Sequence, residues 1–231
     1  MKAPKNSPGS VKQVFWNKSQ PVLFWAWTAF IIFILSFNFF VVGRYSVYPW
    51  WHQHNNDSDA AYAAQTVTLI NGARLSYVHH PGATVYMFDA LAYRAMAAAR
   101  ADYRHLLRLK HITNMDGASD ILESAVRISR IVAFGTAALA VPLIFSLICR
   151  YTSNVFIGGA FTFYIILTPA FLQHSYKVRP ELLSLLFVLA AWLVLARFPR
   201  HLTWAGFFLA ASVFSKIQTG PLIVFTLAGV C

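Results

Sequence analysis

Two acidic residues, Asp57 and Asp59, follow the aromatic pair Trp50–Trp51 and lie beyond an apolar run over Pro21–Val42. The chain contains only eight Asp and Glu residues, and none of them precedes Asp57. Because tryptophan is enriched where a membrane meets water, we expect the two carboxylates where the chain leaves a membrane. A carboxylate in a partly dry cleft can act as a general base, since burial raises its pKa.

The same two acids have a structural alternative. The segment Ala60–Asn71 is expected to be a helix, because its apolar residues recur at helical spacing and Asn71–Gly72 is a stop signal. An acidic residue just before a helix caps its first turn and interacts favourably with its dipole. Capping and catalysis do not exclude each other, so both roles stay open for Asp57 and Asp59.

Two adjacent histidines, His79 and His80, precede a Pro81–Gly82 turn. Histidine can hydrogen-bond a carboxylate or orient a polar acceptor. With His52 and His54 they could also form a metal site, but adjacent histidines point apart and lack the i, i+4 spacing of a helical metal pair. Polar loop residues without a site role are the plainer interpretation.

A third group of polar residues contains Lys177, Arg179 and Glu181. Lys and Arg donate charge-assisted hydrogen bonds to phosphate, and Arg179 could bind it in a bidentate manner while Glu181 holds Arg179 in place. Lys216 interrupts an apolar stretch, where an ionisable residue is costly and indicates a function. The structural alternative is a solvated turn whose long basic side chains reach lipid headgroups, with Glu181 at the positive end of a helix.

Apolar helices in a membrane are the elements that must position these residues. Apolar residues make up 58% of the chain and charged residues 12%, which is about half the charged share of a soluble domain. The apolar residues gather in long runs, which predicts an all-α, polytopic membrane protein. Since the basic residues behind the net charge of +11 lie mostly between these runs, lipid phosphate is a better partner for them than nucleic acid.

The runs predict about five to six transmembrane helices. The four clearest are Pro21–Val42, Ile128–Cys149 with Pro142 inside it, Val155–Gln173 with Pro169 near its end, and Pro180–Ala196. The runs Leu202–Phe214 and Pro221–Cys231 are short for about 30 Å of hydrocarbon, so they form either two tilted or half-length helices or one span and the start of another. Because the sequence stops inside an apolar run, we expect a longer or truncated protein.

The basic residues of the short loops favour a cytoplasmic N-terminus, residues 1–20. The segment 43–127 is then an extracytoplasmic loop with the acidic motif, and residues 128–231 form the helical bundle. Amphipathic helices over Ala83–Ile112 are expected to lie in the membrane interface, followed by a loop over Asn114–Ser119. At the start of the second span, Arg127 and Arg130 are expected to anchor the helix rather than bind a ligand.

The order of these motifs resembles the GT-C glycosyltransferases, above all the polyprenyl-phosphate-sugar-dependent branch that includes protein O-mannosyltransferases and aminoarabinose transferases. The matching stretches are short and spread over nearly the whole chain: Asp57–Tyr62, Asn71–Gly72, His79–Gly82, Arg179–Glu181 and Ser215–Lys216. The adjacent Asp-Glu of the family appears here as Ser58–Asp59, with Asp57 one position earlier, so either acid could be the base.

The resemblance implies an inverting glycosyltransferase of the inner membrane, or the N-terminal module of one. Asp57 or Asp59 would take the proton of an acceptor, and the donor phosphate would be stabilised by Lys177, Arg179 or Lys216. The acceptor would be positioned by Tyr62, His79, His80 and Glu181. No metal or other cofactor is expected, and the partners are membrane lipid and a polyprenyl-phosphate sugar.

Two alternatives remain compatible with the sequence. One is a non-catalytic polytopic protein, such as a component of lipid-linked-sugar transport or assembly, and the other is a truncated, inactive glycosyltransferase. Transport proteins carry charges inside their spans, and the four clearest spans contain almost none in their middles. The sequence therefore favours the enzyme.

Overall fold

The structure is a computed structural model, and it describes residues 20–45, 59–74, 82–108, 115–198, 200–216 and 220. The described part of the chain is all-helical. Its elements are α1 (Gln20–Tyr45), α2 (Asp59–Ile70), α3 (Ala83–Ala99), the short 3₁₀ helix η1 (Ala101–Leu107), α4 (Met115–Thr152), α5 (Val155–Ile166), α6 (Pro169–Tyr176), α7 (Pro180–Arg197) and α8 (Leu202–Ser215).

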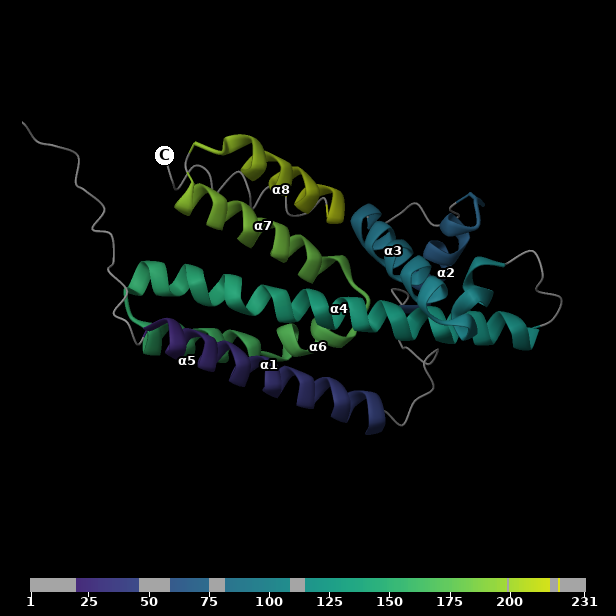
Figure 1. Cartoon of the computed structure of the whole chain (residues 1–231), viewed down its shortest axis with the longest axis horizontal. Helices are drawn as coiled ribbons and strands as arrows, with labels where there is room; N and C mark the ends of the chain where they lie inside the picture. The colour runs from purple at the N-terminus through teal and green to yellow at the C-terminus, as the bar shows by residue number, and fades with distance from the viewer. Residues whose placement is uncertain are drawn as a thin grey trace, which may run out of the picture.

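The long helix α4 is the centre of the fold (Figure 1). It contacts α1, α5 and α6 on one side and α7 on the other, while α8 packs on α7. The helices α2, α3 and η1 lie against the N-terminal half of α4, at one end of the bundle. All helices that carry candidate site residues therefore meet α4 directly or through one neighbour.

The two largest apolar cores both include residues of α4. The bundle core contains residues of α1, α4, α5, α6 and α7, including Ile31, Val141 and Leu182. The second core joins α2, α3 and η1 to the N-terminal half of α4 through residues such as Val67 and Val126. A smaller cluster between them packs Tyr62 of α2 and Tyr86 of α3 against the start of α7.

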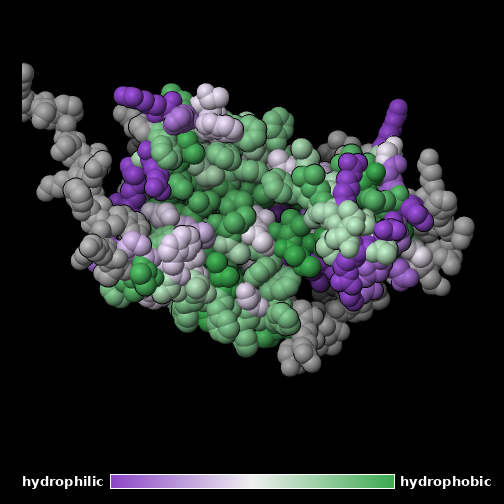
Figure 2. Space-filling model, viewed as in Figure 1, coloured by the Kyte–Doolittle hydropathy of each residue, from purple (hydrophilic) through white to green (hydrophobic). Residues whose placement is uncertain are grey.

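The helix lengths and their surfaces fit a membrane protein. Among the described residues, three helices are long and apolar enough to cross a membrane, over Gln20–Val41, Gly117–Thr152 and Pro180–Arg197. A fourth span results if the bent pair α5 and α6 counts as one. Apolar residues cover the middle of the bundle, and hydrophilic residues gather at its two ends (Figure 2). Five to six spans stay a prediction, because α8 is shorter and Pro221–Cys231 lies outside the described residues.

The predicted second span differs most from the structure. The helix starts at Met115 rather than Ile128, so the loop predicted for Asn114–Ser119 is wrong over its described part. The extra turns form because Ile121, Ala125 and Val126 lie on one face and are buried against α2, α3 and η1. The helix also continues through Pro142, which transmembrane helices tolerate when neighbouring groups satisfy the freed carbonyl.

The predicted third span breaks into two helices. The chain bends by 68° between α5 and α6. Pro169 cannot continue the hydrogen-bond ladder of α5, and it is well placed in the first turn of a new helix. The hydroxyl of Thr168 caps that helix by accepting a hydrogen bond from the Phe171 amide at 3.4 Å.

Helix α5 approaches its neighbours closely at two glycines. A Cβ atom at Gly159 would lie 2.7 Å from the Trp27 ring of α1, and one at Gly158 would overlap Cys149 and Phe145 of α4. Small residues at helix contacts let backbones approach in membranes. By contrast, a Cβ atom at Gly135 of α4 would meet no described atom within 4 Å.

We therefore expect Gly159→Ala to lower the stability of the protein and Gly135→Ala to leave it unchanged or raise it. Both substitutions gain the same helix propensity. The difference between their effects on the free energy of unfolding therefore measures the cost of overpacking against Trp27, about 1–3 kcal/mol. Thermal unfolding of the detergent-solubilised variants measures it. Equal unfolding midpoints would show that α1 moves away from α5 at no cost.

Candidate functional site

Asp59 is the first residue of α2 and joins three separate parts of the chain. Its carboxylate is fully buried. Oδ1 accepts a hydrogen bond from the backbone amide of Val178 at 3.0 Å, and Oδ2 accepts one from Nε of Arg130 at 2.8 Å. Asp59 thus ties the start of α2 to α4 and to the connection between α6 and α7.

Arg130 therefore does not act as the plain interface anchor that the sequence suggested. Its guanidinium binds the buried carboxylate of Asp59, and its side chain is 29% exposed. Arg127 differs, since its side chain is 70% exposed and pairs with Glu123 one turn earlier on α4. Residues three apart share one face of a helix, and of these two arginines Arg130 is the one that reaches the carboxylate of Asp59.

The connection that binds Asp59 also carries the predicted phosphate ligands Lys177 and Arg179. Burial and the neighbouring charge of Arg179 lower the pKa of Lys177, while Asp59 acts in the opposite direction. These charges therefore lie close enough to interact. The structure brings one carboxylate of the acidic motif together with two of the three predicted phosphate-binding residues.

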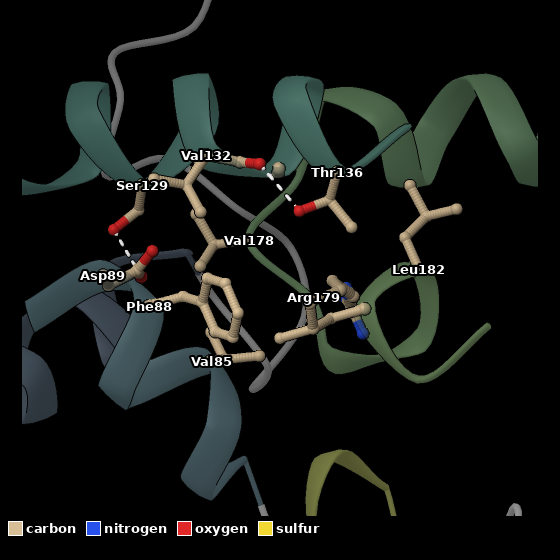
Figure 3. Close-up of a pocket in the computed structure, with 11 residues that line it drawn as sticks. Val85, Phe88, Asp89, Ser129, Val132, Thr136, Val178, Arg179 and Leu182 are labelled. Atoms are coloured by element: carbon tan, nitrogen blue, oxygen red, sulfur yellow. Dashed lines mark hydrogen bonds between the residues drawn. The ribbon is translucent and has the colours of Figure 1, made fainter. Parts of the chain in front are cut away.

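A small pocket, partly open to the outside, lies between α3, α4 and the start of α7 (Figure 3). Its walls are mainly apolar side chains, among them Val85, Phe88 and Leu182. Four of its lining residues are polar or charged: Asp89, Ser129, Thr136 and Arg179. Such a pocket, apolar with a few placed polar groups, is typical of a ligand site.

Asp89 is the residue of this pocket that the sequence analysis missed. Its Oδ2 accepts a hydrogen bond from the Ser129 hydroxyl at 2.6 Å, and the same hydroxyl lies 2.5 Å from Oη of Tyr93. Burial raises the pKa of Asp89 to about 7, and the charge of Asp59 adds to the rise against the hydrogen bond from Ser129. The signal in the sequence was a carboxylate on the same helical face as Val85 and Tyr93, which are apolar or aromatic.

Glu181 and Lys216 form a second polar contact at this end of the bundle. Lys216 Nζ at the end of α8 binds Oε1 of Glu181 in the first turn of α7. Glu181 therefore holds Lys216, rather than Arg179 as the sequence suggested. Neither residue lines the described pocket, so the third predicted phosphate ligand lies apart from it.

Tyr62, a predicted positioning residue, is buried between helices. Its ring centroid lies 5.9 Å from that of Tyr86, and both rings pack near Val178 and Leu183. Its contacts hold α2 and α3 against the start of α7, and it does not line the pocket.

Asp57, His79 and His80, the other predicted site residues, lie outside the described residues, as do His52 and His54. Among the described residues, no group of three or more His, Cys, Asp and Glu side chains is placed to hold a metal ion. The prediction that no metal is needed stays a prediction.

Together these features define a membrane protein, all-helical over its described residues, with a mainly apolar pocket between α3, α4 and the start of α7 that Asp89 and Arg179 line. In comparisons with known proteins, no family model, curated protein or solved structure matches the chain.

Proposed function

We propose that this chain is a membrane glycosyltransferase, or the N-terminal module of one, that transfers a sugar from a polyprenyl-phosphate donor to an acceptor on the extracytoplasmic side of the inner membrane. The observation that carries the proposal is the position of Arg179. It lines a mainly apolar pocket at the end of the bundle and directly follows Val178, whose backbone amide binds Asp59.

The donor phosphate is assigned to Arg179, with Lys177 as a second cation. The apolar walls lower the local dielectric constant, and a guanidinium there stabilises developing phosphate charge more strongly than it would in water. An apolar surface beside a cation also suits the first carbons of a polyprenyl chain. Arg179 has the planar, bidentate donor geometry that phosphate recognition uses.

The general base is assigned to Asp57. Asp59 is unsuited to that role, because it is fully buried and its two oxygens accept hydrogen bonds from Val178 and Arg130. Its contacts instead hold the start of α2 against α4 and the connection before α7. In the proposed reaction the acceptor oxygen forms a bond to the anomeric carbon, its proton passes to Asp57, and the bond from that carbon to the phosphate oxygen breaks.

Arg179→Gln tests this assignment. We expect the rate of transfer from a polyprenyl-phosphate sugar to fall about 10²–10³-fold, as for other lost donors to a developing negative charge. Arg127→Gln is the matched control, because this arginine is exposed and lies outside the pocket. Asp57→Asn is expected to lower the rate by about 10²–10⁴-fold.

Product formation at the wild-type rate in both Arg179→Gln and Asp57→Asn would overturn the proposal. Movement of lipid-linked sugar across vesicle membranes without any covalent product would instead favour a transport component.

A further inference from the structure

Helix α3 carries a stripe of exposed side chains that begins apolar and ends in a cation. Met87 and Leu91 are 61% and 65% exposed, and Arg94 on the next turn is exposed as well. Because positions 87, 91 and 94 follow helical spacing, the three side chains lie on one face of the helix. Another side of α3 is buried in the fold, for instance at Tyr93 and Ala97.

The 3₁₀ helix η1 repeats this combination. Arg104 and Leu107 are both exposed, and residues three apart lie on the same side of a 3₁₀ helix. Since η1 follows α3 almost directly and packs against it, both groups of exposed apolar and basic side chains belong to one part of the molecule.

Arg94 and Arg104 have no carboxylate partner among the described residues, and the exposed ion pairs nearby use other arginines. A guanidinium beside exposed apolar side chains matches the chemistry of a phospholipid, which has a phosphate next to its acyl chains. Arginine binds phosphate through two parallel hydrogen bonds. The surface is therefore complementary in charge to an anionic lipid.

The apolar surface of the bundle continues onto α3. The ring centroid of Phe88 on α3 lies 6.2 Å from that of Phe187 on α7, which lies 6.3 Å from that of Phe208 on α8. Phe88 and Phe207 are 43% and 59% exposed. Because α7 is long and apolar enough to span a membrane, acyl chains around α7 and α8 would reach the start of α3. Helix α3 also crosses α4 obliquely rather than running beside it (Figure 1), as suits a helix at the membrane boundary.

We propose that this face of α3 and η1 binds the bilayer surface and selects anionic phospholipids. Met87 and Leu91 contact the first carbons of the acyl chains, as does Leu107 on η1. Arg94 and Arg104 bind the lipid phosphates. A zwitterionic headgroup carries its own cation, so it competes with the arginines for its phosphate. Each arginine is expected to change the affinity for an anionic lipid about fivefold. The inference does not depend on sugar transfer.

Quenching by brominated lipids tests the inference on the full chain in vesicles. A fluorescent label is attached at Leu91→Cys in a Cys231→Ser background, where Cys149 is buried and stays unlabelled. The vesicles contain phosphatidylcholine and phosphatidylglycerol, and one of the two carries bromine on its acyl chains. Both brominated lipids are expected to quench the label, and phosphatidylglycerol should bind next to it about 5- to 25-fold more strongly.

Arg94→Gln should lower this preference about fivefold, and the addition of Arg104→Gln should remove most of the remainder. Arg127→Gln is the matched control, because it removes the same charge from an exposed arginine that already pairs with Glu123. It should leave the preference unchanged. A label at Phe161→Cys, exposed on α5, should be quenched by both lipids without preference.

Two results would overturn the inference. If neither brominated lipid quenches the label at position 91, the face lies in water or against protein. If quenching shows no preference, or if Arg127→Gln lowers the preference as much as Arg94→Gln does, the two arginines do not select the lipid. Unfolding midpoints confirm that each variant is folded, and a folded double variant that keeps the full preference likewise contradicts the assignment.

Discussion

Asp59→Ala is expected to lower the free energy of unfolding by about 3–5 kcal/mol, the usual cost of removing one partner from a buried ion pair. The substitution leaves the Arg130 guanidinium without the carboxylate that it binds and the Val178 amide without its acceptor. Both losses act at the junction between α2, α4 and the connection before α7. Thermal or denaturant unfolding in detergent measures the change.

Asp102→Ala is the matched control for this prediction. Asp102 also pairs with an arginine at 2.8 Å, but both side chains are more than half exposed, at 60% for Arg100 and 58% for Asp102. An exposed pair contributes about 0–1 kcal/mol. If Asp59→Ala lowered the free energy of unfolding by no more than about 1 kcal/mol, the contribution of Asp59 would be that of a helix cap alone.

Stability should fall as pH rises from about 4 to 7, and Asp89 should be responsible for part of that fall. Burial raises the pKa of Asp89 from 3.8 to about 7 in the folded protein. Between these values the folded chain keeps a proton that the unfolded chain has lost, so the free energy of unfolding decreases with pH. The contribution is about 4 kcal/mol, fully present below pH 4 and lost above pH 7.

Asp89→Asn removes this titration and isolates its effect from that of other groups, including Asp59 and the pocket residue Arg179. We expect the asparagine variant to gain stability relative to the wild type between pH 5 and pH 8. Unfolding midpoints at both pH values measure the gain. Parallel pH curves for the two proteins would contradict a raised pKa at this position.

The helices α1 and α7 were predictable because their signal is local. Helix α1 contains the run Pro21–Val42, and α7 begins at Pro180 as predicted, since each is a continuous apolar stretch. The end of α2 was also predictable. Gly72, two residues past the end of α2, has φ +74°, a backbone conformation that glycine adopts without strain.

The start of α4 was not predictable from local composition. Gly117, Ser119 and Asp120 are typical of a loop, yet they lie in the first turns of the helix. The helix forms there because the following apolar residues are buried on α2, α3 and η1, which are distant in sequence. Tertiary burial outweighed local propensity at this point.

The candidate site, like the fold, was predictable only in part. The residue types of Asp59, Lys177 and Arg179 indicated a charged site, but the hydrogen bond between Asp59 and Val178 joins positions 119 residues apart. Asp89 was missed because its partner Ser129 is 40 residues away and neither residue forms a recognisable motif. Spacing along a chain predicts partners within a helix and says little about contacts between helices.

Because α4 is one continuous helix, a change in the thickness of the surrounding lipid is expected to change the shape of the pocket. Its 38 residues extend over about 57 Å, almost twice the hydrocarbon thickness of a bilayer. Ser129, Val132 and Thr136 form one pocket wall on this same helix. A transmembrane helix tilts when the bilayer becomes thinner. A rigid tilt of α4 would therefore move this wall of the pocket relative to Arg179.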